Sequence, residues 1–221
     1  MFIVIEGLDG AGKSTQVAKL TEYFNAQGKE VEYLHFPRFS APVYGELIAK
    51  FLRGELGAID QVDPQLIALI YAGDRADASG MIGEWLDSGK IVIVDRYVYS
   101  NIAYQCAKST SQSALREWIF DLEYTHNNIP RPDLSIFLNV PFKFTESSLS
   151  KVREGDDRSY LNGKADIHEA SLSFQERVLR EYLSCEGIDP RFRVIDCSTE
   201  QGEMADAQTI FNRIYDEISQ L

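Results

Sequence analysis

The amino-acid sequence predicts a three-layer α/β fold in which a five-stranded parallel sheet is flanked by helices. Two observations carry this prediction. Short apolar segments such as Phe2–Glu6 and Ile91–Val94 lack polar alternation, which is typical of strands buried on both faces of a parallel sheet. Longer segments with helical spacing lie between them, and this alternation favours a parallel sheet with right-handed crossovers.

The elements follow one another in a regular order. The expected strands lie at residues 2–6, 30–36, 90–94, 134–140 and 191–197. The expected helices lie at residues 13–27, 44–53, 64–87, 99–108, 113–126, 166–185 and 203–218. Gly28 suits the end of the first helix and Pro64 the first turn of the third. Gly73, Gly80 and Gly83 lie inside the third helix, where they allow a kink or a break.

The composition fits a single domain that spans residues 1–221. Hydrophobic residues make up 44% and charged residues 25% of the 221 positions, which excludes a disordered, collagenous or coiled-coil chain. The charged stretch at residues 150–159 has no apolar periodicity and sits between helical segments. We therefore expect a mobile loop or lid, as an insert at about residues 150–162.

The charge and the cysteines limit the partners and the compartment. The net charge is −12, and a negative field repels polyanions, so we expect no nucleic-acid and no membrane partner. No apolar run is long enough to span a membrane, and residues 1–6 do not resemble a signal peptide. The three cysteines include no C-x-x-C pair, which predicts buried thiols in a cytoplasmic protein.

The first strand ends in a motif for binding phosphates. Residues 7–14 fit the pattern G-x-x-x-x-G-K-[ST], after a strand and at the start of a helix. Its glycines let backbone N–H groups surround phosphate oxygens, Lys13 reaches the β and γ phosphates, and Ser14 ligates Mg²⁺. The expected ATP-binding residues are Gly7, Leu8, Asp9, Gly10, Ala11, Gly12, Lys13, Ser14 and Thr15.

The loop does not specify the reaction, so several classes of protein stay open. A GTPase switch would add an N-K-x-D motif, which this sequence lacks. Residues 77–80 fit the looser D-x-x-G pattern, but inside an expected helix. A binding module without catalysis and kinases for different acceptors remain to be separated.

Polar residues at the ends of later elements suggest a second phosphate site. Asp95 ends the third strand, where a carboxylate can hold Mg²⁺ through water, and Arg96 follows it. Arg96 either clamps a second phosphate group or forms a simple salt bridge with Asp95. Tyr71 and Arg75 are four residues apart and so share one helix face. Asn101, Tyr104 and Gln105 share another.

Together these motifs resemble thymidylate kinase (dTMP kinase), a family of P-loop nucleoside monophosphate kinases. The resemblance covers nearly the whole chain and rests on residues 2–15, Phe36-Pro37-Arg38, Tyr71-Ala-Gly-Asp-Arg75 and Asp95-Arg96-Tyr97. The P-loop is shared by many nucleotide-binding proteins, whereas its order with the other motifs is much more specific. The resemblance implies a homodimer that phosphorylates dTMP to dTDP with ATP and Mg²⁺, supplying dTTP synthesis.

The resemblance also implies roles for single residues. Arg38 and Arg96 match the arginines that hold the dTMP 5′-phosphate, and Arg75 matches one that bonds a thymine carbonyl. Tyr71 falls where the family stacks an aromatic ring, usually Phe, on thymine. The implied dTMP-binding residues are Asp9, Phe36, Arg38, Tyr71, Arg75, Arg96, Asn101 and Tyr104.

Three of these residues have more specific implied positions. Asn101 matches a polar residue that faces the thymine ring. Tyr104 matches a tyrosine near the sugar C2′, which disfavours a ribose hydroxyl. Asp9 matches an acid near the 3′-hydroxyl and the metal. The expected Mg²⁺ ligands are Ser14, Asp95 and Asp9.

The sequence departs from the family pattern at two places. Some members carry an arginine inside the P-loop where this chain has Gly10, and here Arg153 and Arg158 lie in the lid-like segment instead. This pattern resembles the subclass that delivers catalytic arginines from the lid. His168 stands where relatives commonly have Tyr, and we expect it to be a solvated residue at a helix start.

The chemistry of a nucleoside monophosphate acceptor explains this set of residues. Its phosphate is mostly dianionic near neutral pH, with a second pKa of about 6, so no general base is required. The enzyme must position two anions and compensate their charge. The expected catalytic residues are Lys13, Arg96, Arg153, Arg158 and Asp9. A deoxynucleoside kinase would instead face a neutral hydroxyl and want a carboxylate base.

Overall fold

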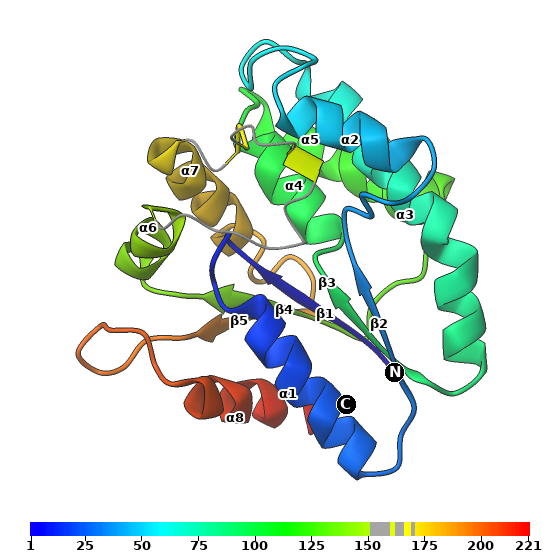
Figure 1. Ribbon diagram of the computed structural model, residues 1–221, viewed down its shortest axis with the longest axis vertical. Coiled ribbons are helices and arrows are strands. Elements are labelled where there is room, and N and C mark those ends of the chain that lie inside the picture. The colour runs from blue at the N-terminus through cyan, green and yellow to red at the C-terminus, as the bar shows by residue number, and fades with distance from the viewer. Residues whose placement is uncertain (151–159, 162–165, 169–170) are drawn as a thin grey trace.

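The computed structural model describes residues 1–150, 160–161, 166–168 and 171–221 (Figure 1). The sheet has the strands β1 (Phe2–Gly7), β2 (Val31–His35), β3 (Ile91–Asp95), β4 (Leu134–Asn139) and β5 (Phe192–Asp196). All pairs are parallel, in the order β2-β3-β1-β4-β5. The predicted five-stranded parallel sheet is therefore confirmed.

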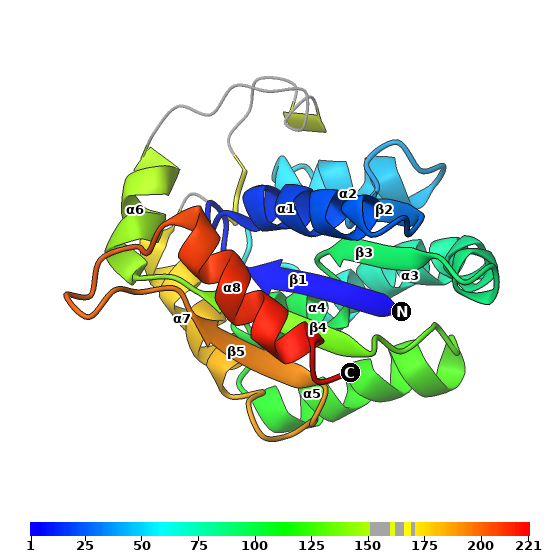
Figure 2. The ribbon, with the colours of Figure 1, turned by 90° about the horizontal axis from the view of Figure 1, so that it is seen from below.

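The helices pack on both faces of this sheet. They are α1 (Lys13–Ala26), α2 (Tyr44–Leu52), α3 (Pro64–Asp87), α4 (Val98–Cys106), α5 (Gln112–Phe120), the π-helix η1 (Asp121–His126), α6 (Phe142–Ser150), α7 (Leu172–Leu183) and α8 (Ala207–Ile218). Figure 1 shows α1 and α8 below the sheet and α4 and α5 above it, and Figure 2 shows α8 in front of the sheet when seen from below.

Strand β1 explains why its apolar run does not alternate with polar residues. Ile3 and Ile5 belong to the core on the side of α1 and α8, whereas Phe2 and Val4 belong to the core on the other side. Both faces of the strand are buried, so every position of the run is apolar up to Glu6.

Some boundaries differ from the sequence prediction. The sixth expected helix does not begin at Asp166, because α7 begins at Leu172, where Ser171 Oγ accepts a hydrogen bond from the Phe174 N–H. The expected helix 113–126 divides into α5 and η1, and α6 was not among the expected ranges. Helix α3 runs unbroken through its three glycines.

Gly73 has a packing role in α3. A Cβ atom there would lie 2.2 Å from Cε1 of Tyr44, so the glycine lets the tyrosine of α2 lie against α3. Gly80 has open space around it. Only the first of these two glycines is required by a neighbour.

The sheet order brings the expected site residues to one edge. Strand β1 pairs with β3, and β3 pairs with β2, so Ile5, Asp95 and His35 stand in register at the carboxyl ends. The loops that follow these strands meet at the same edge.

Two expectations about composition can be compared with the fold. Cys106, Cys185 and Cys197 are all buried free thiols, as predicted. Among the described residues, none of the helices combines the length and the apolarity that a membrane crossing needs.

Candidate active site

A cavity of about 1160 Å³ opens at the carboxyl edge of the sheet. Its walls come from the loop after β1, the segment after β2, α2, α3, the end of β3, α4 and the three residues Tyr160, Asp166 and His168. The expected site residues on its wall are Asp9, Gly10, Ala11, Gly12, Lys13, Ser14, Phe36, Arg38, Tyr71, Arg75, Asp95, Arg96, Asn101 and Tyr104. The expected residues Gly7, Leu8 and Thr15 do not line it.

The phosphate loop has the backbone that its glycines predict. Gly10 and Gly12 have φ angles of 78° and 81°, a left-handed conformation that glycine adopts without a steric penalty. Helix α1 begins directly after Gly12. The Lys13 ammonium is buried and donates to the carbonyl oxygens of Leu8 (3.1 Å) and Gly7 (3.4 Å). Burial, together with the charge of Arg96, lowers the pKa of Lys13.

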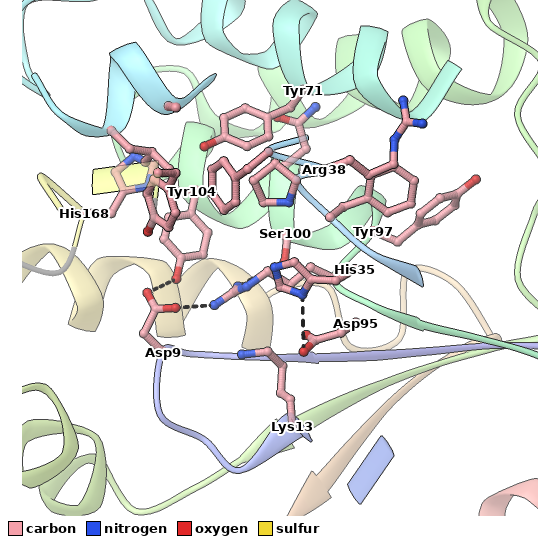
Figure 3. A pocket seen from close by; sticks show the side chains of 18 of the residues that line it. Asp9, Lys13, His35, Arg38, Tyr71, Asp95, Tyr97, Ser100, Tyr104 and His168 are labelled. Atoms are coloured by element: carbon pink, nitrogen blue, oxygen red, sulfur yellow. Dashed lines mark hydrogen bonds and ion pairs between the residues drawn. The ribbon is translucent and has the colours of Figure 1, made fainter. Parts of the chain in front are cut away.

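Asp9 joins this loop to β3 and α4 (Figure 3). Its carboxylate accepts from Arg96 Nη2 at 2.5 Å and from the Tyr104 hydroxyl at 2.9 Å. Gln175 of α7 donates to the same carboxylate at 3.4 Å. Both oxygens of Asp9 are thus engaged by protein groups.

Glu6 fixes the start of α4 and was missed by the sequence analysis. Its buried carboxylate accepts from the backbone N–H groups of Tyr97 (2.9 Å) and Ser100 (3.2 Å), and from the hydroxyls of Ser100 and Tyr182. Burial raises the pKa of Glu6. A single acidic residue at the end of an apolar strand, directly before a glycine loop, is a sequence signal that could have identified Glu6.

Arg96 lies between Glu6 and Asp9 in an unusual backbone conformation. Its φ is 67°, which is uncommon outside glycine, and its Nη1 donates to Ser100 Oγ at 3.2 Å. Arg96 does not form a salt bridge with Asp95 in the structure; its ion-pair partner is Asp9.

The other two expected arginines that the structure describes, Arg38 and Arg75, each have an acidic partner on another element. Arg38 donates through Nε and its backbone N–H to buried Asp74, both at 2.9 Å, and through Nη2 to Asp77 at 2.6 Å. Arg75 is buried in an ion pair with Glu123. The sequence analysis missed Asp74 and Glu123, because no local pattern marks an acid as the partner of a distant arginine.

Asp95 has the features of a metal-binding carboxylate. Its Oδ1 is buried without a hydrogen-bond partner among the residues that the structure describes, and its Oδ2 lies 3.5 Å from His35 Nδ1. Burial alone would raise the pKa of Asp95, but the charges of Lys13 and His35 hold it below its usual range. Ser14, at the start of α1, lines the same cavity. An unpartnered carboxylate oxygen and a hydroxyl fit the oxygen ligands that Mg²⁺ prefers.

One part of the cavity wall is aromatic. Tyr71 faces it from α3, and burial raises the pKa of this phenol. The rings of Phe39 and Tyr160 stack at 3.7 Å, and the Tyr160 hydroxyl donates to Asp166 at 2.8 Å.

The expectation for His168 was wrong. His168 is buried rather than solvated, because α7 begins four residues later and the histidine ring packs 5.0 Å from the Tyr104 ring and 5.3 Å from the Phe51 ring. Within the part of the chain that the structure describes, its Nε2 has no hydrogen-bond partner, and burial lowers the pKa of His168. Arg153 and Arg158, expected in the lid, lie outside the described residues.

A strand, glycine loop and helix with the sequence pattern of a phosphate-binding loop, and arginines on the wall of the same cavity, are typical of a P-loop nucleotide-kinase fold. Comparison with known proteins agrees. The sequence profile described as thymidylate kinase matches residues 5–207. The probable thymidylate kinase of Thermococcus kodakarensis is 33% identical over 97% of this chain and 95% of its own. The thymidylate kinase of Mycobacterium tuberculosis is 32% identical over 93% of this chain and 95% of its own.

A solved structure gives the same result. The thymidylate kinase of Candida albicans superposes with a TM-score of 0.75 at 25% identity, covering 99% of this chain and 91% of that one. The chain therefore belongs to the thymidylate kinase family, and it is an enzyme of the kinase class.

Proposed function

We propose that this chain phosphorylates dTMP to dTDP with the γ-phosphoryl group of ATP. The observation that carries the proposal is a single cavity that joins a phosphate loop to three arginines, each held by a carboxylate. The phosphate loop serves the donor, and the three arginines that line the same cavity serve a second anion and a base.

The donor side is formed by residues 7–15. Backbone N–H groups of the loop and the N-terminus of α1 bind the phosphates of ATP. Lys13 Nζ, which rests on the carbonyls of Gly7 and Leu8, turns to the transferred phosphoryl group. Ser14 and Asp95 would hold Mg²⁺, which would neutralise phosphate charge when bound. Asp9, whose oxygens are engaged by Arg96 and Tyr104, acts by positioning these two residues.

The acceptor side holds a deoxynucleoside monophosphate. Arg38 and Arg96 bind its 5′-phosphate, whose attacking oxygen is already ionised, so this site needs no general base. Tyr71 stacks on thymine. Arg75 and Asn101 form hydrogen bonds with the polar edge of the base. Phe36 supports Arg38, whose guanidinium lies 5.9 Å from the centre of the Phe36 ring. Tyr104 excludes a ribose 2′-hydroxyl by its contact with the sugar. Arg38 and Arg96, which are largely shielded from solvent, compensate the charge as two anions approach.

Arg153 and Arg158 would complete the site from the lid-like segment. We expect Arg153→Ala and Arg158→Ala to lower kcat more than the affinity for dTMP, because an arginine of this kind acts on the transferred phosphoryl group and can be worth about 10³ in rate. An unchanged kcat in both variants would remove them from the mechanism.

We also infer a cytoplasmic homodimer. Leu66 and Leu69 on α3 are 59% and 49% exposed, which offers an apolar contact face. The three buried free thiols suit a reducing compartment. Light scattering coupled to size exclusion measures the mass of the assembly, and a monomer at micromolar concentration would contradict the dimer.

An ADP-release assay over dTMP, dUMP, UMP, dCMP, AMP and thymidine tests the proposed activity. We expect turnover with dTMP, and its loss in Lys13→Met, with Lys29→Met as an exposed control. Activity confined to thymidine would identify a deoxynucleoside kinase. Activity on none of the acceptors would favour a binding module without catalysis.

A further inference from the structure

We propose that Glu123 is a positioning residue that sets the pyrimidine preference of the acceptor site by orienting Asn101 and Arg75. This inference rests on the proposed function and deepens it. Glu123 does not line the cavity, so it acts only through the two residues that do.

One carboxylate oxygen connects the two base-reading side chains. Glu123 Oε1 accepts from Arg75 Nε at 3.0 Å, from Arg75 Nη2, and from Asn101 Nδ2 at 3.0 Å. Oε2 accepts from Arg75 Nε at 3.1 Å. The relative exposure of Glu123 is 0% and that of Arg75 is 1%, so this network is closed to water.

The network decides which atom of Asn101 remains for a ligand. Asn101 Nδ2 has two hydrogens, and they are used by Glu123 Oε1 and by the Ala68 carbonyl at 3.0 Å. The amide is thereby fixed with Oδ1 as its remaining polar atom, and Oδ1 is buried with no hydrogen-bond partner in the described parts of the chain. Asn101 therefore offers the cavity an acceptor.

The same carboxylate decides what Arg75 offers. Its Nε and Nη2 are both bound to Glu123, while Nη1 has no hydrogen-bond partner among the described residues. Because both side chains bond Glu123 Oε1, the acceptor of Asn101 and the donor of Arg75 lie beside each other on the cavity wall.

An acceptor next to a donor matches one class of pyrimidine edge. A 4-keto pyrimidine presents a donor at N3 and an acceptor at O4, which pair with Asn101 Oδ1 and Arg75 Nη1. A 4-amino pyrimidine presents an acceptor at N3 and a donor at the 4-amino group. Acceptor would then oppose acceptor at Asn101 Oδ1, and donor would oppose donor at Arg75 Nη1. In a buried site the unpaired groups are not rescued by water, and such a mismatch discriminates strongly.

Glu123 lies on the π-helix η1, and this position supports a functional role for the residue. Residues 121–126 form the wider turns of η1, and the Ile129 N–H donates to the Glu123 carbonyl at 3.2 Å. Turns of this kind occur frequently at functional sites. A buried ion pair could also serve stability alone, and the two roles differ in their effect on base preference.

The test compares dTMP, dUMP and dCMP in wild type, Glu123→Gln and the exposed control Glu117→Gln. Calorimetric titration gives the Kd of each nucleotide, and turnover gives kcat and KM. In Glu123→Gln we expect the preference in Kd for dTMP and dUMP over dCMP to fall about tenfold or more, since one oriented bidentate contact is worth about that much. The KM for dTMP rises more than kcat falls, and Glu117→Gln keeps the wild-type preference.

If Glu123→Gln does not fold, a second variant tests the same inference. Glu123→Asp keeps the charge for Arg75 but withdraws the carboxylate by one methylene, and we expect a smaller loss of the same preference. A folded variant with unchanged preference, or with equal weakening for all three nucleotides, overturns the inference. A wild type that does not turn over dTMP would instead overturn the proposed function.

Discussion

Asp9 and Arg96 form an ion pair of 2.5 Å that ties the phosphate loop to the end of β3. We expect Asp9→Asn to lower kcat/KM for dTMP about tenfold or more, because a neutral amide keeps the volume but no longer orients the guanidinium by charge. Steady-state kinetics checks this expectation. Asp87→Asn, at the exposed end of α3, is the matched control. Equal activity of both variants would show that the pair is not needed.

The backbone of Arg96 gives a prediction about stability. Its φ of 67° is costly for a residue with a Cβ atom and free of that cost for glycine. Arg96→Gly should therefore be more stable than Arg96→Ala by about 1 kcal/mol, while both lack activity on dTMP. Urea unfolding of the two variants measures the difference. If the alanine variant proves the more stable, the strain at this position is negligible.

Two glycines of α3 offer a matched pair. In Gly80→Ala the new methyl group meets open space, and the better helix propensity of alanine should stabilise the protein by about 0.5–1 kcal/mol. In Gly73→Ala the methyl group collides with the Tyr44 ring, and we expect a net loss of about 1–3 kcal/mol. Thermal unfolding compares them. Stabilisation by both substitutions would mean that Tyr44 moves aside at little cost.

The buried side chain of Lys108 should make the stability of the folded protein depend on pH. Its Nζ is buried and has no hydrogen-bond partner within the described ranges. It lies 4.9 Å from the centre of the Phe51 ring and near His168, and burial lowers the pKa of Lys108 to about 7. The unfolded lysine has a pKa of about 10.4, so between these values the unfolded state binds more protons and stability rises with pH. At lower pH the folded protein carries the full penalty of a buried ammonium.

Lys108→Met removes this penalty. The variant should be more stable than wild type by about 2–4 kcal/mol at pH 6.5, with the difference shrinking towards pH 10. Urea unfolding at a series of pH values measures it, with Lys29→Met as an exposed control. A difference that does not change with pH would contradict a lowered pKa.

Local signals predicted the phosphate site and the sheet. The motif at residues 7–14 is contiguous, so its glycines and its position between a strand and a helix determine its conformation without help from distant residues. The strands were found because burial on both faces leaves an apolar run. The starts of helices were less certain. Before Leu172, the polar and charged residues within 166–170 look like the first turn of a helix, so the sequence alone did not mark Ser171 as the residue that caps it.

The structure shows that part of the acidic excess behind the net charge of −12 lies beside the cavity arginines rather than on the outer surface. Asp9, Asp74 and Glu123 contribute to the acidic excess, yet each accepts from an arginine at the cavity. Part of the excess is therefore internal and orients the basic groups. His168 shows the opposite case, since a residue expected at the surface is enclosed by aromatic rings.

The sequence by itself determined the class of fold, the position of the glycine loop and most of the residues that line the cavity. Only the tertiary structure decided how those residues are held. The acid partners of Arg38, Arg75 and Arg96 lie 36, 48 and 87 positions away along the chain. Periodicity and motifs report on neighbours along the backbone, whereas these pairs arise from the order of the strands and the packing of helices over them.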